Sequence, residues 1–112
     1  MIHSRLTQTG LQISTANGWI VYQPRQTRIV EAHDTDVFCI VREYYMGFSG
    51  SNVYAIDENL KIAWVAELPH ESDIYANILT PSADGFVTST WNGIKCLIDA
   101  KSGRITKLGV SK

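Results

Sequence analysis

Two short clusters combine a histidine with acidic side chains, the residue types that bind metal ions through mixed nitrogen and oxygen ligands. His33 is followed by Asp34 and Asp36, and residues 70–73 hold a histidine, a glutamate and an aspartate. Neither cluster has the His-x-x-x-His or paired-cysteine spacing that is typical of a zinc site. The sequence therefore favours polar turn residues at both places and predicts no metal site and no cofactor.

A nucleophilic enzyme would need a serine or cysteine beside a base. Residues 47–51 (GFSGS) resemble a nucleophile elbow only loosely, because the second glycine comes one residue early and no helix is expected after it. Cys39 lies in the apolar run 37–41, where a thiol is inert. Nine acidic residues lie between positions 31 and 73, but nothing selects two of them as a catalytic pair. We therefore expect no enzymatic activity.

Charge is distributed unevenly over the 112 residues, although the net charge is only −1. Residues 1–30 carry +3, residues 31–73 carry −7 and residues 74–112 carry +3. An acidic centre argues against nucleic acid as a direct partner and allows a basic protein partner, unless folding mixes these charges over the surface. No apolar run is long enough for a membrane span, and no secretory signal is evident, so we expect a cytoplasmic protein with no membrane partner.

The elements expected to position these side chains are β-strands. Alternating apolar residues between turn signals predict about eight strands. The segments are 18–22, 28–32, 37–41, 52–57, 61–68, 86–91, 94–99 and 104–108, with weaker candidates at 11–14 and 74–79. Short connections favour an antiparallel meander, and only 69–79 has any helical tendency. We expect one all-β domain over residues 1–112. Cys39 and Cys96 fall inside strands, and their pairing is left open.

An internal repeat adds to this pattern. Residues 56–62 (IDENLKI) align with residues 98–105 (IDAKSGRI) after one insertion, and the two aspartates are 42 positions apart. A weaker copy at 22–29 has Gln23 in place of the aspartate. A spacing near 40 residues is typical of a four-stranded propeller blade.

Residues 84–105 resemble one repeat of the pyrroloquinoline-quinone-like β-propellers, and residues 52–64, which end at Trp64, resemble a second. The aspartate of such a repeat accepts N–H groups in its turn, glycine supplies positive φ, and tryptophan fills the space between sheets. The resemblance implies two four-stranded sheets, a half-propeller. Because propellers need at least four blades to close, no cofactor of a central channel is transferred.

A half-propeller of this size resembles small bacterial immunity proteins of contact-dependent growth inhibition. That resemblance implies an inhibitor that binds and blocks the active site of a cognate basic toxin such as a ribonuclease. Residues 42–50 add interface-type chemistry, because tyrosine, methionine and arginine are enriched in interface cores. The predicted toxin-binding residues are Glu31, Asp34, Asp36, Glu43, Tyr44, Tyr45, Glu58, Glu71 and Asp73. The alternative is a structural or ligand-binding module that self-associates to complete a propeller, and the free chain is expected to be a monomer or a dimer.

Overall fold

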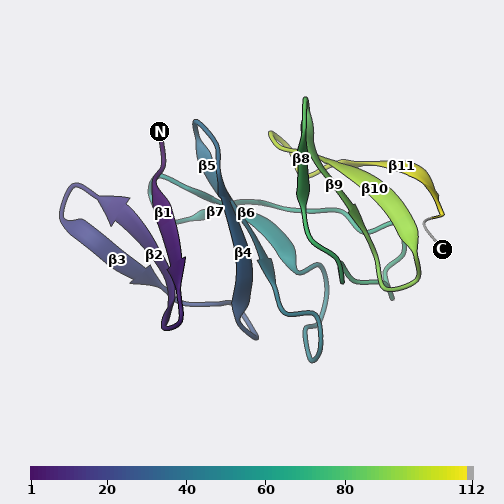
Figure 1. Cartoon of the computed structure of the whole chain (residues 1–112), viewed down its shortest axis with the longest axis horizontal. Helices are drawn as coiled ribbons and strands as arrows, with labels where there is room; N and C mark the ends of the chain where they lie inside the picture. Colours follow the sequence, from purple (N-terminus) through teal and green to yellow (C-terminus); the bar gives the residue numbers. More distant parts are fainter. Residues whose placement is uncertain (111–112) are drawn as a thin grey trace.

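The computed structural model describes residues 1–110, and in this range the chain is all-β, with eleven strands in three antiparallel sheets (Figure 1). The first sheet contains β1 (Ser4–Thr7), β2 (Gly10–Thr15) and β3 (Gly18–Tyr22). The middle sheet contains β4 (Ile29–Asp34), β5 (Phe38–Glu43), β6 (Val53–Asp57) and β7 (Ile62–Val65). The third contains β8 (Thr80–Ser82), β9 (Gly85–Ser89), β10 (Ile94–Asp99) and β11 (Ile105–Val110).

The predicted antiparallel meander is confirmed, but the expected arrangement of about eight strands in two sheets differs from the structure. The N-terminal residues form an additional three-stranded sheet, whose strand β1 has little apolar alternation in its sequence. Within residues 1–110 there is no helix, so 69–79 is a connection, and no helix could cross a membrane.

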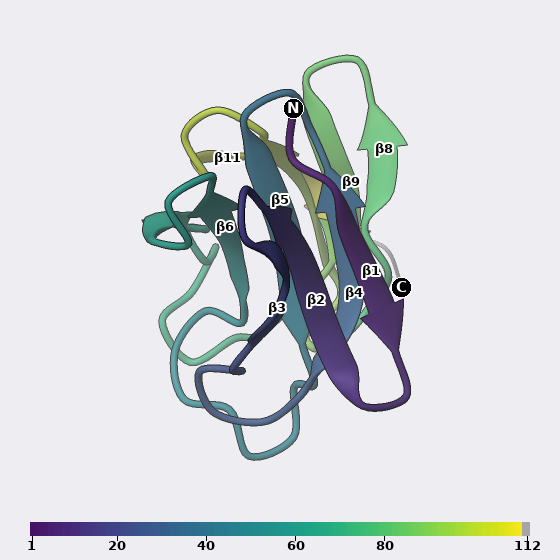
Figure 2. The same ribbon diagram turned by 90° about the vertical axis from the view of Figure 1, so that its left-hand side faces the viewer.

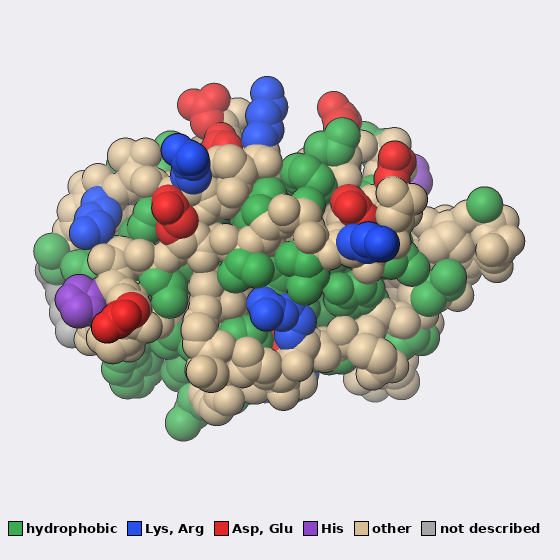
Figure 3. All heavy atoms as spheres, turned by 180° about the vertical axis from the view of Figure 1, so that it is seen from behind, with side chains coloured by type: hydrophobic (Ala, Val, Ile, Leu, Met, Phe, Trp, Pro, Cys, Tyr) green, Lys and Arg blue, Asp and Glu red, His purple; other side chains and the backbone are tan. Residues whose placement is uncertain are grey.

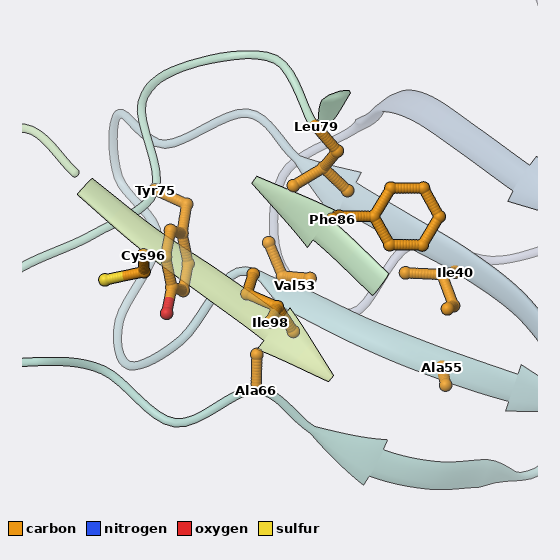
Figure 4. Close-up of a cluster of buried hydrophobic side chains, with 9 residues drawn as sticks. All are labelled: Ile40, Val53, Ala55, Ala66, Tyr75, Leu79, Phe86, Cys96 and Ile98. Atoms are coloured by element: carbon orange, nitrogen blue, oxygen red, sulfur yellow. The ribbon is translucent and has the colours of Figure 1, made fainter. Parts of the chain in front are cut away.

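The three sheets lie in a row along the longest axis, and the middle sheet is covered on both faces (Figures 1 and 2). Alternate residues of β5 and β6 point in opposite directions. Ile40, Val53 and Ala55 pack against the third sheet, and the resulting cluster is drawn in Figure 4. Cys39 and Tyr54 pack against the first sheet. Burial on both sides explains why these two strands are continuously apolar.

The two cysteines are free and lie in different core clusters, Cys39 between the first and middle sheets and Cys96 between the middle and third. Burial raises the pKa of the Cys39 thiol to about 12.

The repeat corresponds to two hairpins. Asp57 Oδ1 accepts the N–H groups of Asn59 and Lys61 at 2.9 and 3.0 Å in the β6–β7 turn. Asp99 Oδ2 accepts the N–H of Ser102 at 3.0 Å in the β10–β11 turn. The weaker copy differs, because residues 23–28 do not close a hairpin but connect β3 to β4 in another sheet.

Trp64 joins the middle and third sheets through the β10–β11 turn. Gly103 has φ +74, and a Cβ there would lie only 2.5 Å from the Trp64 ring. Beside this contact the Glu67 N–H donates to the carbonyl of Gly103 at 2.9 Å. The glycine therefore serves both the turn and the close approach of the indole.

The connections alternate between two ends of the sheets. The turn end comprises the tight turns at 34–37, 57–61, 83–85 and 99–104, several of which lie along the upper edge in Figure 1. The loop end comprises the connections 23–28, 44–52 and 90–93, on the opposite side of the strands. This division decides which of the predicted site residues can act together.

Candidate functional site

The most exposed aromatic side chains with mutual contacts lie at the loop end. The aromatic surface, as we use the term, consists of Tyr44, Tyr45, Met46 and Trp91. The ring centroids of the two tyrosines are 5.1 Å apart, and those of Tyr45 and Trp91 are 5.5 Å apart. Met46 is 60% exposed and Trp91 is 62% exposed. The cluster thus combines residues of the middle and third sheets and leaves large apolar groups in water.

A cation completes this surface. The guanidinium carbon of Arg28 lies 4.6 Å from the centroid of the Tyr44 ring. The strand-to-strand connection that holds Arg28 also fixes the tyrosine, because the Tyr44 N–H donates to the carbonyl of Arg28 at 2.7 Å and the Thr27 hydroxyl donates to the carbonyl of Tyr44 at 2.7 Å.

The remainder of the 44–52 connection is also held in place. The Gln26 side chain donates to the carbonyl of Ser49 at 2.8 Å and accepts the N–H of the same residue at 2.7 Å. Gly47 and Gly50 have φ values of +82 and +86, which a glycine adopts without strain. The glycine-rich segment is therefore a shaped loop, which the Gln26 side chain fixes through the main-chain groups of Ser49.

Glu43 is the anchor beneath the loop end. It is buried, and its carboxylate accepts the N–H groups of Arg25, Gln26 and Thr27 at 2.6, 3.0 and 2.9 Å. The hydroxyl of Tyr54 donates to the same carboxylate. Burial alone would raise the pKa of Glu43, but these four donors hold it below its ordinary value. The structure places this predicted contact residue in the interior, so it positions the surface without belonging to it.

Glu31 is half-buried, and its carboxylate is also bonded to other groups of the protein. Its carboxylate pairs with Arg42 Nε at 2.5 Å and with His33 Nε2 at 3.0 Å, and it accepts the Leu79 N–H at 2.9 Å. Burial alone would raise the pKa of Glu31, but the bonds from His33, Arg42 and Leu79 lower it. His33, which the sequence offered as a metal ligand, also contacts the third sheet, because its ring centroid lies 5.0 Å from that of Phe86.

Three of the predicted acids lie at the turn end. Asp34 accepts the N–H and the hydroxyl of Ser4 at 2.8 and 2.6 Å, which ties the first sheet to the middle one. Asp36 and Glu58 are exposed. The pairings Phe38–Asp57 and Arg42–Val53 lie toward opposite ends of β5 and β6, so these acids are separated from Tyr44 and Tyr45 by the length of the sheet. One small contact patch cannot include both groups.

Charge at the turn end is mixed. The four turn-end ranges contain six acidic and three basic residues, for a net charge of −3. Figure 3 shows acidic and basic side chains beside one another along the upper edge of the molecule. The loop-end ranges contain Arg25 and Arg28 and no acid, for a net charge of +2. The strong acidic block of the sequence is thus diluted by folding.

The other two predicted residues lie in the connection between β7 and β8, and one of them contacts the turn of Trp91. Glu71 is exposed, whereas Asp73 is buried and accepts the N–H groups of Ile74 and Asn92 at 2.9 and 3.3 Å. Because the Trp91 N–H donates to the carbonyl of Ile74 at 2.8 Å, Asp73 helps to fix the turn that presents the indole.

Sequence reasoning missed Trp91 and Arg28 as members of the surface. Trp91 was assigned to the end of a strand, and its neighbours Asn92-Gly93 were the only signal that it stands at an exposed turn. Within residues 1–110 no group of three His, Cys, Asp or Glu side chains is arranged to hold a metal ion.

The comparisons with known proteins identify the family of the chain but no individual relative. The profile of one protein family, described as a domain of unknown function (DUF7957), matches residues 1–110. No curated protein and no solved structure matches the chain.

Proposed function

The chain belongs to the DUF7957 family, and we propose that it is a non-catalytic binding protein that inhibits a cognate protein partner through the aromatic surface. The single observation that carries this proposal is the contact series Arg28–Tyr44–Tyr45–Trp91 at the loop end. Trp91, at one end of the series, is 62% exposed, and Met46, next to Tyr45 in the sequence, is 60% exposed. Tryptophan, tyrosine and arginine are the residues that most often dominate binding energy at protein interfaces.

The way this surface is built favours binding. The backbone of Tyr44 is bonded to Arg28 and Thr27, and the turn of Trp91 is bonded to Ile74. A surface that is ordered before binding loses less conformational entropy when the partner arrives. Tyrosine and tryptophan also supply large contact area with only two side-chain torsions each.

The charges of the loop end define what the contacted patch should carry. Arg25 and Arg28 are complementary to acidic or aromatic groups on the partner, next to apolar groups that cover Trp91. For the partner itself we keep the proposal of a protein toxin such as a basic ribonuclease. If the overall positive charge of such a toxin determined where it binds, the toxin would bind the acidic turn end instead. Substitutions at the turn end and in the aromatic surface distinguish these two binding sites.

The three sheets stacked face to face support our interpretation of the chain as an incomplete propeller. Strand β1 lies against β4, and the Ser4–Asp34 bonds join the first sheet to the middle one. An incomplete propeller leaves loops of neighbouring sheets close together, as at Tyr45 and Trp91.

The test is to measure binding of candidate basic ribonuclease toxins by calorimetry, with inhibition of RNA cleavage as the second readout. We expect Trp91→Ala to weaken the affinity at least tenfold, about 1.4 kcal/mol. Val37→Ala is the control, because Val37 is 56% exposed but lies at the turn end, and we expect it to change the affinity less than twofold. Equal affinities for the two variants would rule out the aromatic surface as the contact.

A further inference from the structure

The first sheet has three strands, whereas the middle and third sheets each have four. Strand β3 is the outer edge of this sheet, and no further strand of residues 1–110 pairs with it. Figure 2 shows the first sheet at the front of the molecule, with the other two behind it. The edge of β3 is therefore open to another chain.

The residues of β3 lack the features that normally protect an edge. Trp19, Ile20 and Val21 are 44%, 39% and 50% exposed, and residues 16–24 contain no charged side chain. An uncharged apolar edge without a bulge or an internal proline is a template for pairing with another strand.

The other outer edges are protected. The edge strand β11 contains Lys107 and pairs through an irregularity in register. The edge strand β7 also pairs through a register shift, and it is flanked by Lys61 and Glu67. The short edge strand β8 is uncharged and regularly paired, but it contains Pro81. Among the edge strands of the described residues, β3 therefore combines regular pairing with a sequence that has neither a charge nor a proline.

The register shows which main-chain groups are available. The Ser14 N–H donates to the carbonyl of His3, so the main-chain groups of Ser14 face β1. The direction of main-chain hydrogen bonds alternates along a strand. The N–H and C=O groups of Ile13 therefore point to β3, and those of its partner Ile20 point to β2. Trp19 and Val21 then direct their N–H and C=O groups to the open edge.

We propose that two copies of this chain form a dimer by antiparallel pairing of their β3 strands about a two-fold axis at Ile20. In this register Trp19 of each copy pairs with Val21 of the other, which forms four main-chain hydrogen bonds and one continuous six-stranded sheet. Ile20 lies opposite Ile20 of the second copy, at the close spacing of a non-hydrogen-bonded pair.

A second copy fits this edge better than a strand of a charged partner for two reasons. The pairing is self-complementary, as a two-fold interface requires. No charge of residues 16–24 meets a like charge across the axis, because the segment has none. The proposal does not depend on the aromatic surface, which lies at the junction of the middle and third sheets and stays exposed in such a dimer.

The test is sedimentation equilibrium of the whole chain at concentrations up to about 1 mM. We expect a dimer for the unmodified protein and a monomer for Ile20→Lys, because two ammonium groups would face each other across the axis. Ile62→Lys is the matched control on the edge strand β7, since Ile62 is also 39% exposed, and we expect it to remain dimeric. Circular dichroism confirms that each variant is folded.

A rescue separates loss of pairing from misfolding. Neither Ile20→Lys nor Ile20→Glu should dimerise alone, but an equimolar mixture should form a heterodimer through the opposite charges. A monomeric unmodified protein over the whole concentration range would overturn the proposal, even if a strand of another protein binds the edge. Equal dimerisation of Ile20→Lys and Ile62→Lys would overturn it as well.

Discussion

The turn end and the loop end are built from different kinds of residue, and the carboxylates that shape their connections bond over different sequence distances. At the turn end, Asp57 and Asp99 bond to N–H groups within a few positions of themselves. At the loop end, Glu43 bonds to residues 16 to 18 positions away, and Tyr45 contacts Trp91. Turns that are closed locally leave their acids on the surface, whereas loops closed by distant groups require buried polar anchors and can present aromatic rings.

The largest effect is expected when the anchor of the loop end is removed. Glu43→Ala leaves the N–H groups of Arg25, Gln26 and Thr27 and the hydroxyl of Tyr54 without their acceptor. We expect the free energy of unfolding to fall by about 3 kcal/mol, because the buried Tyr54 hydroxyl and three partly buried N–H groups lose one charged partner.

Urea unfolding measures this loss. Glu58→Ala at the turn end is the control, and a change within about 0.5 kcal/mol is expected there. A small effect of Glu43→Ala would mean that water replaces the carboxylate and that the loop end is not held as we describe.

Two glycines with positive φ give the next comparison. Gly103→Ala at the turn end combines an unfavourable φ of +74 with a Cβ 2.5 Å from the Trp64 ring. Gly50→Ala at the loop end has a φ of +86 and open space around the new Cβ. We expect losses of about 2 and about 1 kcal/mol in unfolding free energy, since only the first adds a steric clash to backbone strain. Thermal unfolding of both variants checks the ranking, and equal losses would show that the Trp64 contact contributes nothing.

Acid should weaken the loop end through the buried Glu43. The folded-state pKa of Glu43 lies below its ordinary value of 4.5, so its contribution is complete above about pH 5 and is lost as pH falls through the lower folded value. Each unit of lowering corresponds to about 1.4 kcal/mol. Unfolding free energies measured from pH 7 to pH 2 should therefore fall less steeply for Glu43→Gln than for the unmodified chain. Parallel curves would contradict the buried, hydrogen-bonded carboxylate.

The smallest effect is expected from the charges of the turn end. The double substitution Asp36→Asn and Glu58→Gln removes two exposed charges and should leave the affinity for a partner within about twofold. Binding titrations at low and high salt measure this effect. A tenfold loss of affinity at low salt that is absent at high salt would show that the partner binds the turn end and not the aromatic surface.

The sequence was informative wherever a contact is local. Alternation predicted most of the strands but missed β1 and β8 and offered 74–79, which holds only an isolated bridge at Tyr75. The repeated aspartate turns predicted the β6–β7 and β10–β11 hairpins. It was misleading at Gln23, where a similar string of residues connects two sheets, because the acceptor that shapes it is the distant Glu43. The predicted toxin-binding residues lie in different places for the same reason, because the burial of a side chain and its hydrogen-bond partners depend on residues far along the chain.

By itself, the sequence determined that this chain is all-β, which segments alternate and where the tight turns fall, because strand period and turn hydrogen bonds involve neighbouring residues. Only the tertiary structure decided that three sheets stack, that Glu43 is buried and that the half-buried Glu31 is bonded inside the protein. It also decided that Tyr45 meets Trp91 and that the edge of β3 stays open. Those features come from the packing of faces against one another, and the same alternating pattern is compatible with several ways of stacking the sheets.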